Sequence, residues 1–466
     1  MGLHPTHLIP TLLLLLNYGG ASIAAIHALL TNPDPRSALS WIAVSWLIPI
    51  AGPLLYWLFG INRVLRHRSF DLWPSTLSGS VPSGADLTFC ADQVRVGGAL
   101  TRRPLETGNC IETLHNGEIA FPRMLQAIDG ATRSVWLSTY IFQSDSVGKQ
   151  FVQALVSANR RGVEVRVLID GIGEWYSWPH VVPMLRRAGV RAERFLPPRL
   201  VPPAFPLNCR NHRKILVVDG ARAFMGGMNL GGREMAGSLG RGMSDLHFAL
   251  QGPVVAQLAQ TFAEDWAFAA GERLAASPPQ PSSGPITSRV ITGGPDQDLD
   301  KLLLVILGAL SSARRCVQIM TPYFIPPLEL VAALETAALR GVRVSLVLPE
   351  RSNLRYVDWA TLHWLPALVA RGVQVHLRRP PFSHAKLLVV DGVYAHIGSV
   401  NVDTRSLRLN FEVAVEVYDA EFCRQLEAFI RSHEEETPAL TLNAMADSGP
   451  LRRVRNALCW LVSPYL

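Results

Sequence analysis

The chain has 466 residues, with 44 Lys and Arg against 37 Asp and Glu, which gives a net charge of +7. Its six cysteines form no CxxC pair or other metal-ligand spacing, so neither a zinc module nor a disulfide framework is expected, which fits a reduced compartment. The basic balance suits an anionic lipid bilayer, whereas nucleic acid is not expected because the chain lacks a long basic run and an aromatic stacking platform.

The first 60 residues are almost free of charge, with Asp34 and Arg36 as the exceptions. Two apolar runs, 8–30 and 38–60, are each long enough to cross a bilayer at about 20 residues per crossing. We therefore predict a two-helix transmembrane hairpin over 1–68. A cleaved signal peptide is the alternative, but no Lys or Arg precedes the first run.

Basic residues follow the second apolar run at once, and they are Arg63, Arg66 and Arg68. By the positive-inside rule they place the rest of the chain on the cytoplasmic side. Proline-, glycine- and serine-rich stretches then mark the remaining boundaries. The expected parts are a linker at 69–107, a first domain at 108–274, a linker at 275–287, a second domain at 288–440 and a tail at 441–466.

Both expected domains carry the same polar residues at the same spacing. Each has a His, a Lys two positions later, an Asp five positions after the Lys, and an Asn ten positions after the Asp. The two sets are His212, Lys214, Asp219 and Asn229, and His384, Lys386, Asp391 and Asn401. One His-x-Lys pair means little, but two copies with identical offsets predict a catalytic site built from both domains.

An apolar, β-branched run follows each Lys, at 215–218 and 387–390, and predicts a buried strand that ends in an Asp-Gly turn. On a strand, residues two apart share a face, so each His and Lys should lie side by side. Gly-Val pairs also recur before each motif, at 162–163 and 189–190 and again at 341–342 and 372–373. Each domain should therefore run helix, strand, helix, strand and catalytic strand, which is an α/β arrangement.

Two His, two Lys and two Asn together suit a tetrahedral phosphodiester. The Lys and Asn side chains can hold the phosphoryl oxygens, while one His attacks phosphorus and the other protonates the leaving group. Asp219 and Asp391 close the far ends of their strands, so we expect them to brace the structure. No metal or other cofactor is expected, because the lysines take the place of the cation.

These residues resemble the paired HKD motifs of the phospholipase D superfamily. Finer features, at 211–214, 321–326, 401–406 and 409–412, resemble its bacterial cardiolipin synthase branch. The resemblance covers about 108–440. It implies two duplicated α/β/α domains that share one active site, in an enzyme of the bacterial cell membrane.

The resemblance also implies a reaction. Phosphatidylglycerol serves as donor and acceptor, and a phosphatidyl group passes through a phosphohistidine on His212 while His384 acts as acid, giving cardiolipin and glycerol. An orienting carboxylate is expected for each His, with Glu412 assigned to His384 and Asp245 to His212.

Three other functions remain open, namely a membrane-anchored phospholipase D that transfers to water, a nuclease of the same superfamily and an inactive membrane scaffold. The sequence symmetry leaves open which His is the nucleophile. It also leaves open any acceptor beyond phosphatidylglycerol, the regulation, the oligomeric state and the role of the proline-rich loop 197–206. An apolar stripe near the C-terminus predicts a helix that lies on a membrane or packs on the domain, formed by Leu451, Val454, Leu458 and Leu461.

Overall fold

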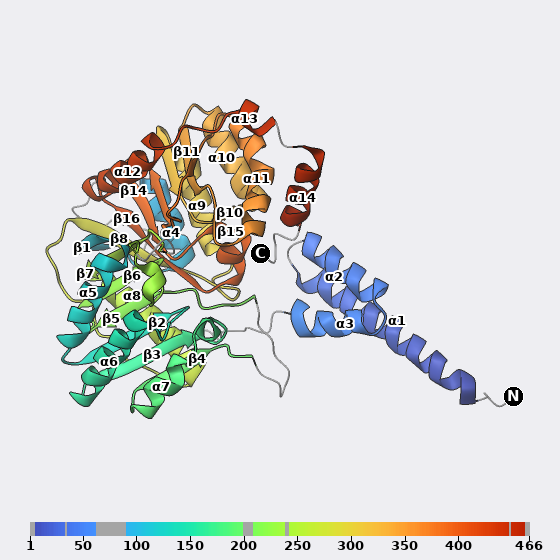
Figure 1. Cartoon of the computed structure of the whole chain (residues 1–466), viewed down its shortest axis with the longest axis horizontal. Coiled ribbons are helices and arrows are strands. Elements are labelled where there is room, and N and C mark those ends of the chain that lie inside the picture. The colour runs from blue at the N-terminus through green and yellow to red at the C-terminus, as the bar shows by residue number, and fades with distance from the viewer. Residues whose placement is uncertain are drawn as a thin grey trace. The chain divides into compact units, whose positions relative to one another are not determined.

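The computed structural model describes residues 5–32, 35–61, 90–198, 208–237, 242–446 and 449–461 (Figure 1). The chain divides into two compact units. One comprises Met1–Leu65 and Pro197–Leu207, and the other comprises Arg66–Leu196 and Asn208–Leu466. Three features considered above lie wholly or mostly outside the described residues, namely the basic residues at 63–68, most of the linker at 69–107 and most of the loop 197–206.

The first unit is a small helical assembly. Its elements are α1 (Pro5–Thr31), α2 (Pro35–Leu47), α3 (Ala51–Leu55) and the π-helical turn η1 (Tyr56–Gly60). Ala24, Ala28 and Tyr56 form its buried centre, and the Tyr56 hydroxyl lies 2.7 Å from Nδ1 of His27.

The prediction of one helix over 38–60 is wrong. The helix α2 ends at Leu47, and the chain turns before α3 begins at Ala51. Pro49 lies in this break and has no N–H to continue the helix, while Ile50 takes a positive φ of 62°. Within the described ranges, no helix combines the length and the apolarity needed to cross a membrane.

The second unit contains two halves with the same order of elements. The first half comprises β1 (Glu106–His115), α5 (Asn116–Asp129), β2 (Ser134–Thr139), α6 (Ser146–Arg160), β3 (Glu164–Asp170), η3 (Gly173–Tyr176), α7 (Val181–Arg187), β4 (Arg191–Phe195), β5 (Ile215–Val218), β6 (Arg222–Gly226), η4 (Gly232–Glu234), β7 (Leu246–Gln251) and α8 (Val254–Ala270). The second half comprises β8 (Ile286–Gly293), α9 (Lys301–Ser312), β9 (Cys316–Met320), β10 (Phe324–Ile325), α10 (Leu328–Leu339), β11 (Arg343–Pro349), α11 (Arg355–Ala370), β12 (Gln374–Arg378), β13 (Leu387–Val390), β14 (Tyr394–Gly398), β15 (Val402–Asp403), η5 (Arg405–Leu409), β16 (Glu412–Tyr418) and α12 (Ala420–Glu435). The remaining helices are α4 (Ala91–Thr101), α13 (Leu442–Ala446) and α14 (Pro450–Leu461).

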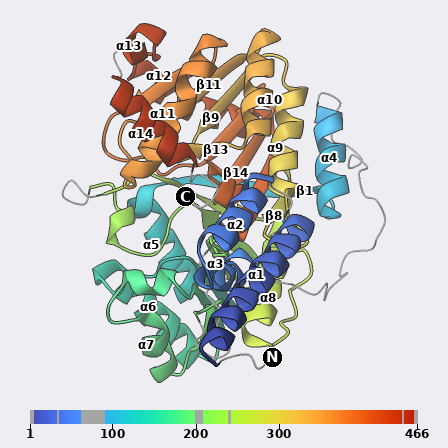
Figure 2. The ribbon, with the colours of Figure 1, turned by 90° about the vertical axis from the view of Figure 1, so that its right-hand side faces the viewer.

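One sheet runs through both halves. Its order is β12-β11-β9-β13-β14-β16-β8-β1-β7-β6-β5-β2-β3-β4, so each strand of one half has a counterpart at the same distance from the centre. The halves meet at the antiparallel pair of β1 and β8, where Asn109 lies opposite Ile286. Figure 2 shows helices of both halves covering this sheet. The duplicated α/β fold expected from the motifs is confirmed.

The Gly-Val repeats have a local physical cause. Gly162 and Gly341 each follow a helix and take a φ of +87°, which only glycine adopts without strain. The arginine before each of these glycines also makes the same kind of contact in both halves. Arg161 donates to the carbonyls of Ile128 and Ala131, and Arg340 donates to those of Leu310, Ser311 and Ala313. These arginines therefore cap the C-terminal ends of α5 and α9.

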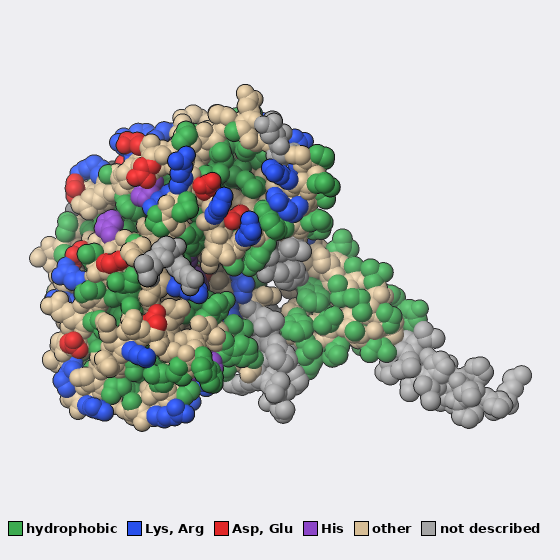
Figure 3. All heavy atoms as spheres, in the orientation of Figure 1, with side chains coloured by type: hydrophobic (Ala, Val, Ile, Leu, Met, Phe, Trp, Pro, Cys, Tyr) green, Lys and Arg blue, Asp and Glu red, His purple; other side chains and the backbone are tan. Residues whose placement is uncertain are grey.

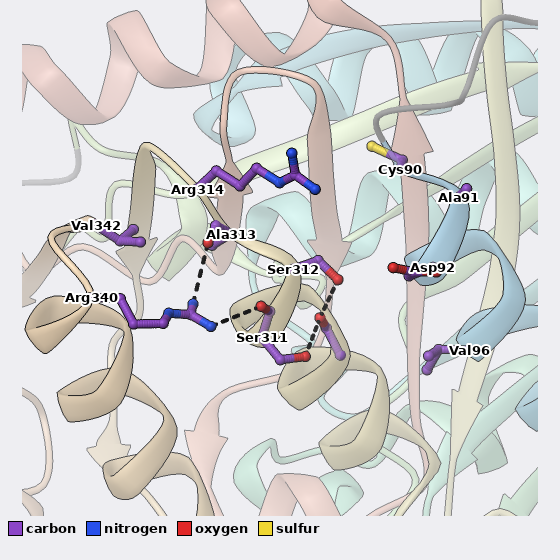
Figure 4. Close-up of a pocket in the computed structure, with 11 residues that line it drawn as sticks. Cys90, Ala91, Asp92, Val96, Ser311, Ser312, Ala313, Arg314, Arg340 and Val342 are labelled. Carbon is purple, nitrogen blue, oxygen red and sulfur yellow. Dashed lines mark hydrogen bonds between the residues drawn. The ribbon is translucent and has the colours of Figure 1, made fainter.

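Arg340 also lines a cavity of about 550 Å³ between α4 and the ends of α9 and α10 (Figure 4). Its guanidinium is turned toward the backbone of α9, as the dashed lines show. The helix α4 lies inside the stretch expected to be a linker, and it packs against α9 through Val94. Gln93 adds a hydrogen bond of 3.1 Å to the carbonyl of Val305. This part of the expected linker therefore belongs to the core of the second half.

Candidate active site

The His-x-Lys pairs stand just before their strands rather than on them. The strand β5 begins at Ile215, and its counterpart β13 begins at Leu387. The segments before them are held by the opposite half. The backbone N–H of His212 donates to the carbonyl of Phe411 at 2.9 Å, and that of His384 donates to the carbonyl of Ser244 at 2.7 Å. Each half therefore fixes the other half's histidine.

Each histidine bonds a carboxylate of the opposite half. Nδ1 of His212 lies 3.1 Å from Oε2 of Glu412, and Nδ1 of His384 lies 3.0 Å from Oδ2 of Asp245. The pairing expected from the sequence, with each carboxylate serving the His of its own half, is therefore wrong. Each histidine crosses the junction of the halves and meets the start of a strand of the other half, His212 at β16 and His384 at β7. The hydrogen bonds of both histidine rings are made by Nδ1, so Nε2 is the ring nitrogen that could act on a bound molecule.

The two lysines lie beside the histidines and are almost fully buried. Nζ of Lys214 donates to the carbonyl of His212 at 2.8 Å, and Nζ of Lys386 donates to that of His384 at 2.6 Å. Burial lowers the pKa of Lys214 to about 7 and lowers that of Lys386 as well. A phosphate between them would favour both charged forms, because an opposite charge at short range favours ionisation.

The two His–carboxylate pairs differ in their surroundings. Glu412 accepts hydrogen bonds from the Ser399 hydroxyl and from Nδ2 of Asn410. Burial alone would raise the pKa of Glu412, but His212, Lys214 and the Ser399 hydroxyl bring it below its ordinary value. Burial also lowers the pKa of His212 to about 4. This pair therefore consists of a carboxylate and a neutral imidazole at neutral pH.

The second pair retains a proton more readily. Burial raises the pKa of Asp245 to about 8, and the nearby carboxylate of Glu234 adds to this rise. Burial and Lys386 hold the pKa of His384 well below its ordinary value. Nζ of Lys386 also lies 3.1 Å from Nδ1 of His384. The Asp245–His384 pair can therefore keep a shared proton at a pH where the first pair has lost its own.

Glu234 is a site residue that the sequence reasoning missed. It is 2 % exposed, and its Oε1 accepts from the backbone N–H and from Nδ2 of Asn229, at 3.2 and 3.4 Å. Burial raises the pKa of Glu234 to about 7. The sequence places Glu234 five positions after Asn229. The second half has Ser406 at the same distance from Asn401, so the comparison of the two halves did not mark Glu234 as a site residue.

Two tyrosines, also missed, lie against the histidines. The ring centroids of Tyr140 and His212 are 5.3 Å apart, and those of Tyr323 and His384 are 6.2 Å apart. Tyr140 also lies beneath Nζ of Lys214, at 5.5 Å from the ring centroid. Aromatic faces stabilise a cation in this position, so Tyr140 supports the charged form of the lysine.

Asp219 and Asp391 lie away from these groups and hold loops. Asp219 accepts from the backbone N–H groups of residues 132, 133 and 134, and Asp391 accepts from those of residues 314, 315 and 316. Both take a positive φ, of 54° and 53°, in the turn that joins the two strands of a hairpin. Each aspartate therefore fixes the backbone of the loop before a neighbouring strand, which is a structural role.

The fold also assembles a group that the sequence spacing does not reveal. Among the described residues, Glu234, Asp245 and His384 bring possible metal-ligand atoms within 4.8 Å of one another. Nζ of Lys386 already lies 3.1 Å from Nδ1 of His384. A divalent ion there would be repelled by this ammonium, so the donor set does not fit a resident metal well.

Comparison with known proteins agrees with this geometry. A family model described as "Cardiolipin synthase, PLD-like domain" matches 124–266 and 306–433, which include both motifs. The chain belongs to the cardiolipin synthase family. A second model, "Phospholipase_D-nuclease N-terminal", matches 21–60.

Several curated members of the cardiolipin synthase family are similar over most of their length. A cardiolipin synthase of Geobacillus kaustophilus is 34 % identical over 84 % of this chain and 81 % of that protein. The major cardiolipin synthase of Bacillus subtilis is 30 % identical over 93 % and 94 %. Among solved structures, phosphatidylserine synthase of Haemophilus influenzae superposes with a TM-score of 0.62 at 15 % identity, covering 80 % of this chain and 99 % of that one, and so shares the fold.

Proposed function

We propose that this member of the cardiolipin synthase family transfers a phosphatidyl group between two phosphatidylglycerol molecules, giving cardiolipin and glycerol. The observation that carries the proposal is the pair of opposed histidines, each bonded to a buried carboxylate and flanked by a buried lysine. A phosphodiester offers oxygens for the lysines and a phosphorus between the two Nε2 atoms. Membership of the family supports the choice of lipid.

The first step uses the difference between the two pairs. His212 is neutral, and its Nδ1–H donates to Glu412, so the lone pair of Nε2 is free to attack phosphorus. The bond from phosphorus to the glycerol headgroup breaks, and His384 gives the departing oxygen the proton that it shares with Asp245. Glu412 stabilises the positive charge of the resulting phosphatidyl-imidazolium, as a buried carboxylate does for a triad histidine.

The second step reverses the proton transfer. The glycerol hydroxyl of a second phosphatidylglycerol gives its proton to His384 and attacks phosphorus, and the bond to Nε2 of His212 breaks. Lys214, Lys386, Asn229 and Asn401 would hold the phosphoryl oxygens in both steps. One phosphodiester is exchanged for another, so no nucleotide is needed and the equilibrium should lie near balance.

We place the reaction at the cytoplasmic face of a bacterial cell membrane. The substrates are lipids, and the first unit supplies an apolar segment with Asp34 and Arg36 as its formal charges within residues 1–60. An anchored site gains from the high local concentration of lipid acceptors over soluble alcohols.

The test is the conversion of phosphatidylglycerol labelled in its headgroup glycerol by the purified full-length enzyme. Labelled free glycerol and a four-chain lipid should appear together, and added glycerol should drive the reaction back. Phosphatidic acid as the main lipid product would show a phospholipase D that transfers to water. Cleavage of nucleic acid, or no turnover of any phosphodiester, would favour the nuclease or the scaffold.

A further inference from the structure

The helix α14 turns its apolar side outward. Its stripe of large apolar side chains is largely exposed, at 84 % for Leu451, 57 % for Val454, 60 % for Leu458 and 66 % for Leu461. These positions follow the helical repeat, so they form one continuous face of the helix. A surface helix of a soluble protein normally buries such a face.

The opposite side of α14 is fastened to α11, as Figures 1 and 2 both show. The Trp460 ring stacks on the His363 ring with centroids 4.7 Å apart, and Arg455 lies 4.4 Å above the Trp359 ring. Asn456, on the same side, is 7 % exposed. The direction of the apolar stripe is therefore fixed by packing.

Basic side chains border the stripe. Arg452 and Arg453 are exposed beside it, while the described part of α14 contains no acidic residue. In Figure 3, Lys and Arg side chains lie next to apolar ones over the region that α14 occupies in Figure 1. An apolar stripe with basic flanks is the pattern of a helix that lies in the headgroup region of an anionic bilayer.

The position of α14 relative to the active site agrees with such an orientation. The helix α11 begins after the C-terminal end of β11. The equivalent segment of the first half, which contains η3, begins after the C-terminal end of β3. Both strand ends lie on the side of the sheet where β5 and β13 begin and where the His-x-Lys segments lie. The segment that contains η3 exposes three aromatic rings, with Trp175 at 64 %, Tyr176 at 58 % and Trp178 at 83 %. Exposed Trp and Tyr are typical of the membrane interface.

We propose that the α14 stripe (Leu451, Val454, Leu458 and Leu461) docks on the surface of an anionic bilayer and turns the active-site edge toward the lipid headgroups. The apolar side chains enter the acyl boundary, and Arg452 and Arg453 meet lipid phosphates. This inference rests on the proposed function for its lipid substrates. Its test is independent of turnover.

The test places a photoreactive diazirine amino acid at position 458 of the full-length enzyme, in nanodiscs that contain phosphatidylglycerol. The matched control carries the same residue at position 339, because Leu339 is also exposed, at 66 %, but ends α10 at the opposite sheet edge. Lipid adducts at 458 and few at 339 are expected. Adducts at 458 to residues 1–61 or to a second copy would overturn the proposal, as would labelling by water alone.

A kinetic test follows from the same geometry. Leu451→Glu with Leu458→Glu should lower turnover of phosphatidylglycerol in vesicles at least about tenfold, since each leucine would lose its burial in lipid. Turnover of a soluble short-chain phosphatidylglycerol should be unchanged, and Leu339→Glu should affect neither. Equal losses on both substrates, or no loss on vesicles, would contradict membrane docking. If wild type makes no cardiolipin from either substrate, the proposed function fails, while the photolabelling still decides the docking.

Discussion

Replacing Glu412 by glutamine should lower kcat by about 10³–10⁴-fold in a protein that remains folded. The Glu412 side chain is fully buried and accepts hydrogen bonds from three groups. The Ser399 hydroxyl donates to Oε2, Nδ2 of Asn410 donates to Oε1, and Nδ1–H of His212 is the third donor. An amide has one acceptor oxygen in place of two, so the NH₂ of a glutamine at this position would stand against one of these donors and within reach of Nδ1 of His212, which lies 3.1 Å from Oε2 and 3.0 Å from Oε1 of Glu412. The imidazole proton would then move to Nε2, which blocks the nucleophile.

The expected size follows from this change of tautomer. In a serine-protease triad, the same change from carboxylate to amide costs about 10⁴-fold in kcat. A loss of 10³–10⁴-fold corresponds to about 4–5.5 kcal/mol of transition-state stabilisation, at about 1.36 kcal/mol per factor of ten. The assay is release of labelled glycerol from phosphatidylglycerol under saturating lipid.

Glu416 supplies the matched control. It lies four positions further along the same strand, is also fully buried, and pairs with Arg289 away from the histidines. Glu416→Gln breaks a buried ion pair, so it should lower the free energy of unfolding by about 3–5 kcal/mol while the folded fraction keeps its kcat. A Glu412→Gln enzyme within tenfold of wild type would refute the assignment, and so would an equal loss of kcat in folded Glu416→Gln.

Three further results are expected. His212→Ala or His384→Ala should each lose at least about 10²–10⁴-fold in turnover, and near-normal activity of either variant would exclude a shared site. Activity should survive EDTA, because Lys386 occupies the place of a cation, whereas strict loss that one divalent ion restores would contradict this. The pH profile of kcat/KM should fall on the acid side as His212, with its pKa near 4, becomes protonated and loses its lone pair. It should fall on the alkaline side as Lys214, with its pKa near 7, loses its charge. Lys214→Arg should leave the acid limb in place and move the alkaline limb upward only to about pH 8, where Asp245 loses the proton that it shares with His384.

Local signals were sufficient to predict much of the fold and to select the candidate site residues that the fold brings together. The run 215–218 and the Asp219-Gly220 turn specify a hairpin through neighbouring residues, and the structure forms it with β6. Glycines after helices mark strand starts because the required positive φ is a property of one residue. Repetition then did what a single motif could not, since it identified His212 and His384 among the histidines of the chain.

Contacts between distant residues could not be predicted in the same way. Glu412 is 200 positions from His212, and Asp245 is 139 positions from His384. Sequence offsets within one half suggested the opposite pairing, because they carry no information on how the halves face each other. The prediction of one continuous helix over 38–60 failed for a related reason. The mean apolarity of 38–60 gives no sign of the break, because Pro49 removes the N–H of a single helical hydrogen bond.

The two halves repeat their candidate reactive groups, yet the proposed two-step transfer needs these groups to differ. One histidine must be neutral to attack phosphorus, while the other must hold a proton for the leaving group. The differences lie in residues that are not repeated. Five positions after each active-site Asn stands Glu234 in the first half and Ser406 in the second. Glu234 adds negative charge beside Asp245 and so favours retention of the proton by the His384 pair, whereas Ser399 and Asn410 favour the ionised form of Glu412 beside His212. In the proposed mechanism, duplication therefore supplies the two histidines, while single substitutions around them decide which is the nucleophile and which is the acid.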